Sequence, residues 1–105
     1  MTIEELGVIL QTTDLPVAYL AFKASETPKM PFIVFQETGS DNFGADNIVY
    51  HSGARIQVDL LCKTKSRETE MLLETTFTEN NIFWVREVDF DSNEDYYRTT
   101  YEIVI

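Results

Sequence analysis

Few residues in this chain of 105 could support covalent chemistry. A nucleophile could be built only from His51 with its neighbour Ser52, or from Cys62, the single cysteine. A catalytic nucleophile needs a base within hydrogen-bond reach and a third group that orients the base. Neither an activating-base spacing nor a nucleophile elbow surrounds these residues. We therefore expect no enzymatic activity, and because Cys62 shares a register with apolar residues, we expect it to be a small buried side chain.

An acidic stretch near the end of the chain is similar to the start of a calcium-binding loop. Its oxygen-bearing residues alternate as the first ligands of such a loop do: Asp89, Asp91, Asn93 and Asp95. The sixth position of the loop requires glycine and is Glu94, and the twelfth requires glutamate and is Thr100. We therefore interpret the stretch as a solvated acidic turn. The four glycines are scattered, so no phosphate-binding loop is predicted, and we expect neither a metal nor any other cofactor.

The balance of charge limits the possible partners. Eighteen acidic residues against eight basic ones give a net charge of −10, which repels phosphate backbones and anionic lipid surfaces. We expect no specific nucleic-acid binding and no membrane partner. A single cysteine cannot form an intramolecular disulfide, and residues 1–5 lack the positive charge and the apolar run of a signal peptide. We therefore expect synthesis in a reducing cytoplasm.

The first element that could position a site is a helix over residues 3–12. Thr2 and Glu5 have the spacing of a capping box, and apolar residues follow them at helical spacing. This helix should end before Pro16, because proline disfavours helical geometry in the residue ahead of it.

Two strands and a loop should come next. The β-branched and aromatic composition of residues 17–23 and 32–38 predicts two strands joined by a turn. Residues 39–47 are dense in turn formers and predict a loop with one large apolar residue, Phe43. An aromatic side chain in a polar loop is often a contact residue. The candidate contacts with another subunit or partner are four residues of this loop: Asp41, Asn42, Phe43 and Asp46. Phe43 could instead fold back on its own core.

The second half of the chain predicts one helix and three strands. A strand should begin at Ile48, and strands over 82–88 and 96–105 should flank the acidic turn. A helix capped by Ser66 should run to about Thr78. Its apolar face should contain residues such as Thr69, Leu72, Leu73, Thr76 and Phe77, and its solvated face Arg67, Glu70 and Glu74.

Together these elements give the order α-β-β-β-α-β-β in a single domain, residues 1–105. The expected fold class is α+β, with a mostly antiparallel sheet of about five strands and two helices packed on one face. Residues 32–35 and 82–85 place apolar groups on both faces of their strands, although two helices can cover only one face. Either polar side chains and the loop cover the remainder, or the second face meets another subunit.

A family resemblance is carried by residues spread over most of the chain. These are Leu-Pro-Val-Ala-Tyr at 15–19, Tyr50 with Arg-Ile-Gln-Val-Asp-Leu at 55–60, and the closing run at 94–105, Glu-Asp-Tyr-Tyr-Arg-Thr-Thr-Tyr-Glu-Ile-Val-Ile. In this arrangement, with a helix between the last two segments, the chain resembles small minor structural proteins of long-tailed phages and of prophages in Gram-positive bacteria. These are the tail-completion, or tail-terminator and head-tail joining, proteins.

The resemblance implies a protein without enzymatic activity that forms a ring, commonly a hexamer, at the head-proximal end of the tail tube. Such a ring ends tube growth and docks the head connector. The implied partners are other copies of the chain, the tail tube protein and head-tail connector proteins. The implied location is the tail or neck of a virion, assembled in the cytoplasm of the host bacterium. The family has no fixed catalytic or ligand motif, so the resemblance assigns no residue a role.

A ring through which DNA leaves the head would benefit from acidic residues on its channel, because like charge does not hold a phosphate backbone. The candidate channel-facing acids cluster at the acidic turn: Asp89, Asp91, Glu94 and Asp95. They could equally be solubilising surface charges. Two other functions stay open. One is a head-tail adaptor or stopper of the same neck. The other is a small cytoplasmic enzyme or ligand-binding domain of ferredoxin-like type, which would need a pocket with converging polar groups.

Overall fold

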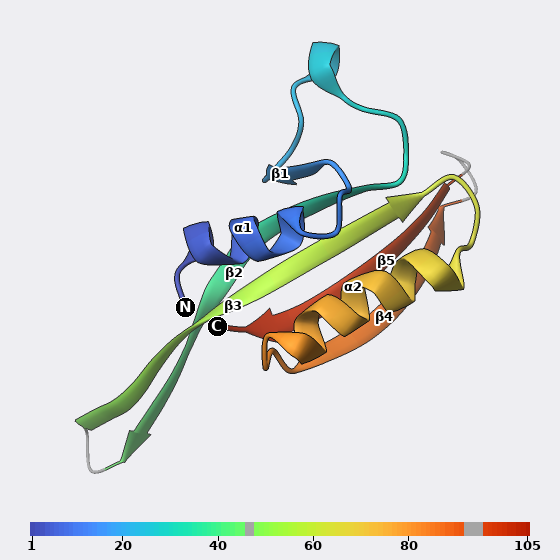
Figure 1. Cartoon of the computed structure of the whole chain (residues 1–105). Coiled ribbons are helices and arrows are strands. Elements are labelled where there is room, and N and C mark those ends of the chain that lie inside the picture. Colours follow the sequence, from blue (N-terminus) through green and yellow to red (C-terminus); the bar gives the residue numbers. More distant parts are fainter. Residues whose placement is uncertain (46–47, 92–95) are drawn as a thin grey trace.

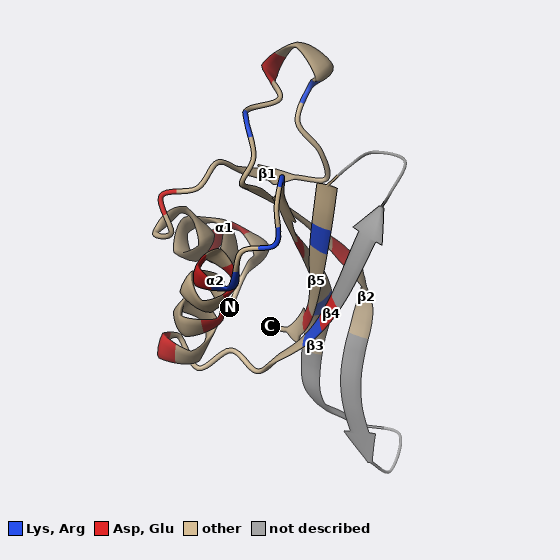
Figure 2. Cartoon of the chain, turned by 90° about the vertical axis from the view of Figure 1, so that its right-hand side faces the viewer, with Lys and Arg blue, Asp and Glu red and all other residues tan. Residues whose placement is uncertain are grey.

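The computed structural model describes residues 1–45, 48–91 and 96–105, with the side chains of residues 1–40, 53–87 and 96–105. One sheet contains five strands, β1 (Val17–Tyr19), β2 (Phe32–Ala45), β3 (Ile48–Cys62), β4 (Trp84–Asp91) and β5 (Tyr96–Val104). Their order across the sheet is β1-β2-β3-β5-β4 (Figure 1). β1 is parallel to β2, and the other neighbours are antiparallel. Helices α1 (Ile3–Gln11) and α2 (Arg67–Glu79) lie on one face (Figure 2), so the predicted fold class and element order are confirmed.

Helix α1 begins at the predicted capping box. The Thr2 hydroxyl accepts a hydrogen bond from the Glu5 N–H at 3.1 Å, and the Glu5 carboxylate accepts one from the Thr2 N–H at 3.4 Å. Leu6 and Leu10 are fully buried against the sheet. Gly7 faces β2, where a Cβ would lie 3.4 Å from the ring of Phe35, at ordinary van der Waals contact.

Helix α2 begins where Ser66 accepts a hydrogen bond from the Thr69 N–H at 3.3 Å. It ends at Glu79, close to the predicted end at about Thr78, and is followed by Asn80 and by Asn81, which takes a left-handed conformation with φ 59°. The predicted faces of this helix are partly wrong. Glu70 and Glu74 are buried, whereas Leu72 is 43% exposed. Burial of the two acids is possible because the sheet and the start of the helix supply partners for both carboxylates, as described below.

The core lies between the helices and one face of the sheet. Alternate residues of β3 and β5 point into it and are almost fully buried: Ile56, Val58, Leu60, Tyr101 and Ile103. Leu73 and Phe77 of α2 pack onto these strands, and the ring of Phe77 meets that of Tyr101 edge-on at 5.6 Å. Cys62 is buried in the same layer, which confirms its prediction. Burial raises the pKa of the Cys62 thiol, and the nearby Glu70 charge adds to this.

The predicted connection between the first two strands is wrong. β1 ends at Tyr19, because Leu20 is left-handed with φ 70°, and β1 runs parallel to β2. A parallel pair needs a crossover in place of a tight turn, and residues 20–31 form it. Phe22 of this crossover lies edge-on to Phe32 at 5.3 Å and covers it on the face away from the helices.

The predicted loop over residues 39–47 is also wrong. β2 continues to Ala45 and pairs with β3, which begins at Ile48, while residues 46–47 lie outside the described residues. The glycines that suggested a turn lie at two irregularities in the ladder, between Glu37 and Gly39 and between Phe43 and Gly44. Extra residues at β-bulges are accommodated without ending a strand, so turn-forming composition misled the prediction.

Candidate assembly interface

A two-stranded ribbon extends beyond the body of the sheet (Figure 1). We call this ribbon, residues 39–45 and 48–53, the arm. The backbone ladder between β3 and β5 ends where Ala54 pairs with Ile105, and β1 pairs with β2 only at Ile33–Phe35. Among the described residues, both outer edges of the arm therefore have no neighbouring strand. At ~3.3 Å per residue the arm is about 20 Å long, and the molecule measures 49 Å along its longest axis against 27 and 25 Å.

An arm of this kind favours a partner. An isolated two-stranded ribbon is marginally stable in water, and unpaired strand edges invite pairing with another chain. The arm contains three of the candidate contact residues. Asp41, Asn42 and Phe43 lie on its β2 strand, opposite Gly53, Ser52 and His51. Asp46 lies outside the described residues.

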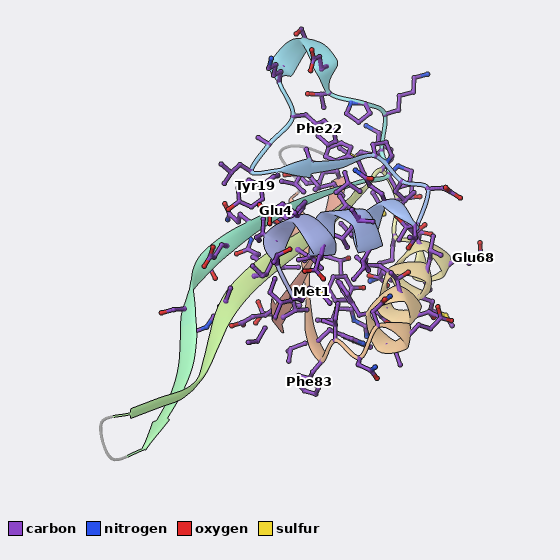
Figure 3. The ribbon with its side chains drawn as sticks, turned by 60° about the vertical axis from the view of Figure 1, so that its left-hand side comes forward. Met1, Glu4, Tyr19, Phe22, Glu68 and Phe83 are labelled. Carbon is purple, nitrogen blue, oxygen red and sulfur yellow. The ribbon has the colours of Figure 1, made fainter. Side chains whose placement is uncertain are left out.

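The opposite edge of the sheet is formed by β4. Exposed apolar side chains gather beside this strand. Phe83, immediately before it, is 81% exposed and projects away from the body (Figure 3), and Val85 is 49% exposed. Met71 and Trp84 line a groove between α2 and β4. Exposed apolar groups at an unpaired strand edge mark a candidate contact surface.

The residues of the predicted acidic turn are only partly in the described chain. β4 continues to Asp91, so Asp89 and Asp91 belong to the strand, where they pair with Arg98 and Tyr96 of β5. The prediction that both lie in the turn is therefore wrong. Glu94 and Asp95 lie outside the described residues.

The face of the sheet away from the helices is polar at its centre. Asp59 accepts hydrogen bonds from Gln57 at 3.1 Å and from the Thr100 hydroxyl at 2.8 Å. A shallow depression of about 280 Å³ lies beside them, lined by Thr38, Arg55, Gln57, Val85, Glu87, Thr100 and Glu102. Polar side chains therefore cover the second face in this region, as in the first of the two alternatives drawn from the sequence. Phe32, Phe83 and Val85 are apolar residues from the two segments that carried this question. Phe32 is covered by the crossover, and Phe83 and Val85 lie at the β4 edge.

A buried carboxylate, Glu70, ties the start of α2 to the sheet. Lys65 donates a hydrogen bond to it at 2.7 Å, and Arg67 donates one at 3.1 Å. The Thr99 hydroxyl of β5 donates a third at 2.8 Å. Burial alone would raise the pKa of Glu70, but these three donors outweigh it and hold the pKa below its ordinary value of 4.5.

Glu74, one turn later, forms a second set of contacts. It accepts hydrogen bonds from the Tyr101 hydroxyl of β5 and from Arg86 of β4, both at 2.7 Å, and Arg67 approaches at 3.5 Å. Burial and the bond to Glu74 raise the pKa of Tyr101, and the same carboxylate raises the pKa of Arg86. Each carboxylate is thus contacted by three donors, and the two together hold α2 against β4 and β5. Sequence reasoning missed this network, although hydroxyls at core-facing positions 99 and 101 were a signal that buried acceptors lie opposite them.

The two positions that could start a nucleophile, His51 and Cys62, do not lie together. His51 and Cys62 lie eleven residues apart on the same strand, which separates them by about 36 Å. Within the same part of the chain, no three His, Cys, Asp or Glu residues are grouped so that they could hold a metal ion. No helix there has the length and apolar composition needed to cross a membrane.

The pKa of Glu70 predicts a dependence of stability on pH. Because its pKa is lower in the folded chain than in the unfolded chain, its contribution is complete above about pH 4.5 and is lost as the pH falls through the folded value. Urea unfolding of the native chain between pH 7 and pH 3 should therefore show a decline at the acidic end. Glu70→Gln should flatten that decline, since an amide does not titrate. Parallel curves for the two proteins would contradict the assignment.

Comparison with known proteins gives no assignment: no protein-family model matches the chain, and no curated protein matches it.

Proposed function

We propose that this chain is a structural subunit that assembles into a ring at the head-proximal end of a phage or prophage tail tube, where it ends tube growth and docks the head connector. The observation that carries the proposal is the arm, whose two outer edges have no neighbouring strand among the described residues. A ribbon of this length is stabilised by pairing or packing with another chain. The family resemblance of the sequence supplies the setting in which that chain is another copy or a neck protein.

The layering of the domain supports a ring with a polar channel. Both helices lie on one face of the sheet, so a ring closed around the opposite face keeps the bulky helical layer outside (Figure 2). The inner surface would then contain Asp59, Glu87 and Glu102, with Arg55 beside Glu102 at 4.0 Å. Acidic side chains on this surface repel a phosphate backbone and let DNA pass without being held.

The chemistry of the buried acids favours an assembly role over catalysis. A general base needs an accessible lone pair near a substrate. Glu70 and Glu74 instead accept hydrogen bonds from groups of the same chain and link α2 to the sheet. The depression on the polar face has a volume of about 280 Å³, which is small for a small-molecule site.

Light scattering after size-exclusion chromatography tests the proposal. The native chain is expected to form multimers at near-millimolar concentration, or on tail tubes of the phage or prophage that encodes it. The matched control replaces residues 42–52 by Asn-Gly, a two-residue hairpin connection between the paired residues Asp41 and Gly53. This control should stay folded, because the core lies in the body of the sheet, and it should remain monomeric. A native chain that is monomeric under both conditions rejects the proposed function.

A further inference from the structure

The direction of the backbone groups on β4 follows from the sheet. Ala54 and Ile105 exchange two backbone hydrogen bonds, at 3.1 and 3.0 Å. In an antiparallel ladder these directions alternate from residue to residue. The N–H of Glu102 therefore points toward β4, and that of its partner Val85 points back toward β5. The N–H and C=O groups of Arg86, and by the same alternation of Val88, point outward from the sheet.

The outer edge of β2 offers the matching groups. Ile33 donates to the Pro16 carbonyl at 2.8 Å, and the Phe35 carbonyl accepts from Leu20 at 2.8 Å, so β1 uses the outward groups there. Beyond β1, Thr38 is an extra residue in the ladder between β2 and β3. Because of this bulge, the backbone N–H and C=O groups that point away from β3 are those of even-numbered residues, Ser40 and Asn42. No described strand pairs with this part of β2.

We propose that β4 of one copy pairs, antiparallel, with the free outer edge of β2 in the next copy. The occupant is a second copy because the topology already provides the correct direction. β2 is antiparallel to β3, β3 to β5 and β5 to β4, so β2 and β4 run in opposite directions. Copies repeated in one orientation therefore bring these edges together as an antiparallel pair, which is the more stable kind. The inference rests on the proposed ring and names its subunit contact.

One register satisfies the outward groups of both strands. In it Arg86 lies opposite Asn42 and Val88 opposite Ser40 of the next copy. β4 then ends beside β1, which already occupies Ile33–Phe35, so the two strands share the edge of β2 without overlap. This register places Phe43 opposite Val85, close to the exposed Phe83.

The charges at this contact are mixed. Residues 39–54 contain two aspartates and no lysine or arginine. The receiving side presents Arg67 at the groove between α2 and β4 and Arg86 on β4 itself, with side chains 51% and 33% exposed. In the proposed register Arg86 lies opposite Asn42, and both arginines already pair with Glu74. Asp41 lies opposite Glu87, so the contact depends on the backbone groups and not on charge.

The stagger of this contact suits a closed ring. Within one copy, Val88 of β4 pairs with Thr99 of β5, Thr99 with Leu60 of β3, and Leu60 with Ile33 of β2. Val88 and Ile33 therefore lie at the same height along the sheet. When Val88 pairs with Ser40 of the next copy, that copy is displaced along the strand direction by about six residue rises, roughly 20 Å. The four strands of one copy span roughly 19 Å across the sheet. The strands would incline by roughly 45° to the axis of the assembly, close to the inclination in closed β-barrels.

Disulfide trapping tests the contact and its register. In a Cys62→Ala background, Asp41→Cys and Glu87→Cys lie opposite each other in the proposed register, on the same face. Oxidation of the double variant should give a ladder of multimers that stops at the ring, and a mixture of the two single variants should give only mixed dimers. A control with Ser40→Cys and Glu87→Cys places the thiols on opposite faces and should cross-link far more slowly. Dimers of Glu87→Cys alone would show a two-fold β4–β4 pair and overturn the proposal.

A backbone test separates this proposal from the proposed function. Ser40→Pro removes an outward N–H and leaves the inward ladder with β3 intact, so it should abolish assembly while urea unfolding of the monomer stays as in Ser40→Ala. Ser40→Ala should assemble normally. If Ser40→Pro assembles like the native chain and the thiols of Asp41→Cys and Glu87→Cys do not link, the contact is wrong and the ring stands. If the native chain does not assemble at all, both proposals fall.

Discussion

Replacing Glu74 by alanine is expected to lower the free energy of unfolding by about 3–5 kcal/mol, as for other buried ion pairs that lose one partner. The Tyr101 hydroxyl, fully buried, and Arg86 both donate to this carboxylate at 2.7 Å. Alanine leaves the hydroxyl without an acceptor and removes the link between α2 and β4. Small domains have a free energy of unfolding of about 5–15 kcal/mol, so this single change would remove a large part of it.

Urea unfolding at pH 7 measures the effect, and two variants calibrate it. Glu79→Ala changes an exposed acid of the same helix and should stay within about 0.5 kcal/mol of the native chain. Tyr101→Phe removes one hydrogen bond but keeps Arg86 on the acid, so its loss should be smaller, about 1.5–3 kcal/mol. A loss below about 1 kcal/mol for Glu74→Ala would mean that the network does not hold α2 in place.

Reversing charge on the polar face is expected to slow DNA release from assembled particles. Glu87→Lys and Glu102→Lys together raise the net charge of the surface proposed to line the channel by four per copy, and a ring repeats the change in every copy. Lysines that pair with phosphates bind DNA with a strong dependence on salt. Release should slow by roughly tenfold or more at low salt and recover as salt is raised.

The control for this experiment makes the same charge change on the helical side. Glu4→Lys on α1 and Glu79→Lys on α2 alter net charge equally but would face outward, so release should remain normal. Tail completion must be equal in both variants before release is compared. Equal release rates for the two variants at low salt would remove the channel assignment.

Much of the fold followed from local chemistry in the sequence. The capping box at Thr2 and Glu5 and the Ser66 cap begin their helices where predicted, and the asparagines after α2 end it. These signals involve residues within a few positions of one another, so sequence alone contains them. Alternation along β3 likewise predicted which residues are buried, Cys62 among them.

The errors concern features that depend on distant residues. The sequences of β1 and β2 do not by themselves determine that the two strands pair in parallel. The continuation of β2 through residues 39–45 depends on β3 as its partner. The burial of Glu70 and Glu74 requires donors on β4 and β5 that lie 12 to 29 residues away. A helix pattern read in isolation assigns such acids to solvent, because charged residues are rarely buried without partners.

The contact residues of the assembly could be named only in part. Phe43 was selected because it is aromatic among turn formers, and its place on an arm strand was not foreseen. The apolar pattern of residues 82–85 drew attention to the start of β4, but its position at the border of the sheet arises from strand order and was not predicted.

The bulge at Thr38 also constrains how the arm can change in length. Side chains alternate between faces with a period of two, so the extra residue inverts the arm relative to the body of β2. A second unpaired residue on this strand would turn every side chain of the arm to the other face and exchange the inward and outward backbone groups. Paired insertions that add two residues to each strand would preserve both. Insertions at the base of the arm, between the bulge and Ser40, should therefore preserve its faces only when they add an even number of residues.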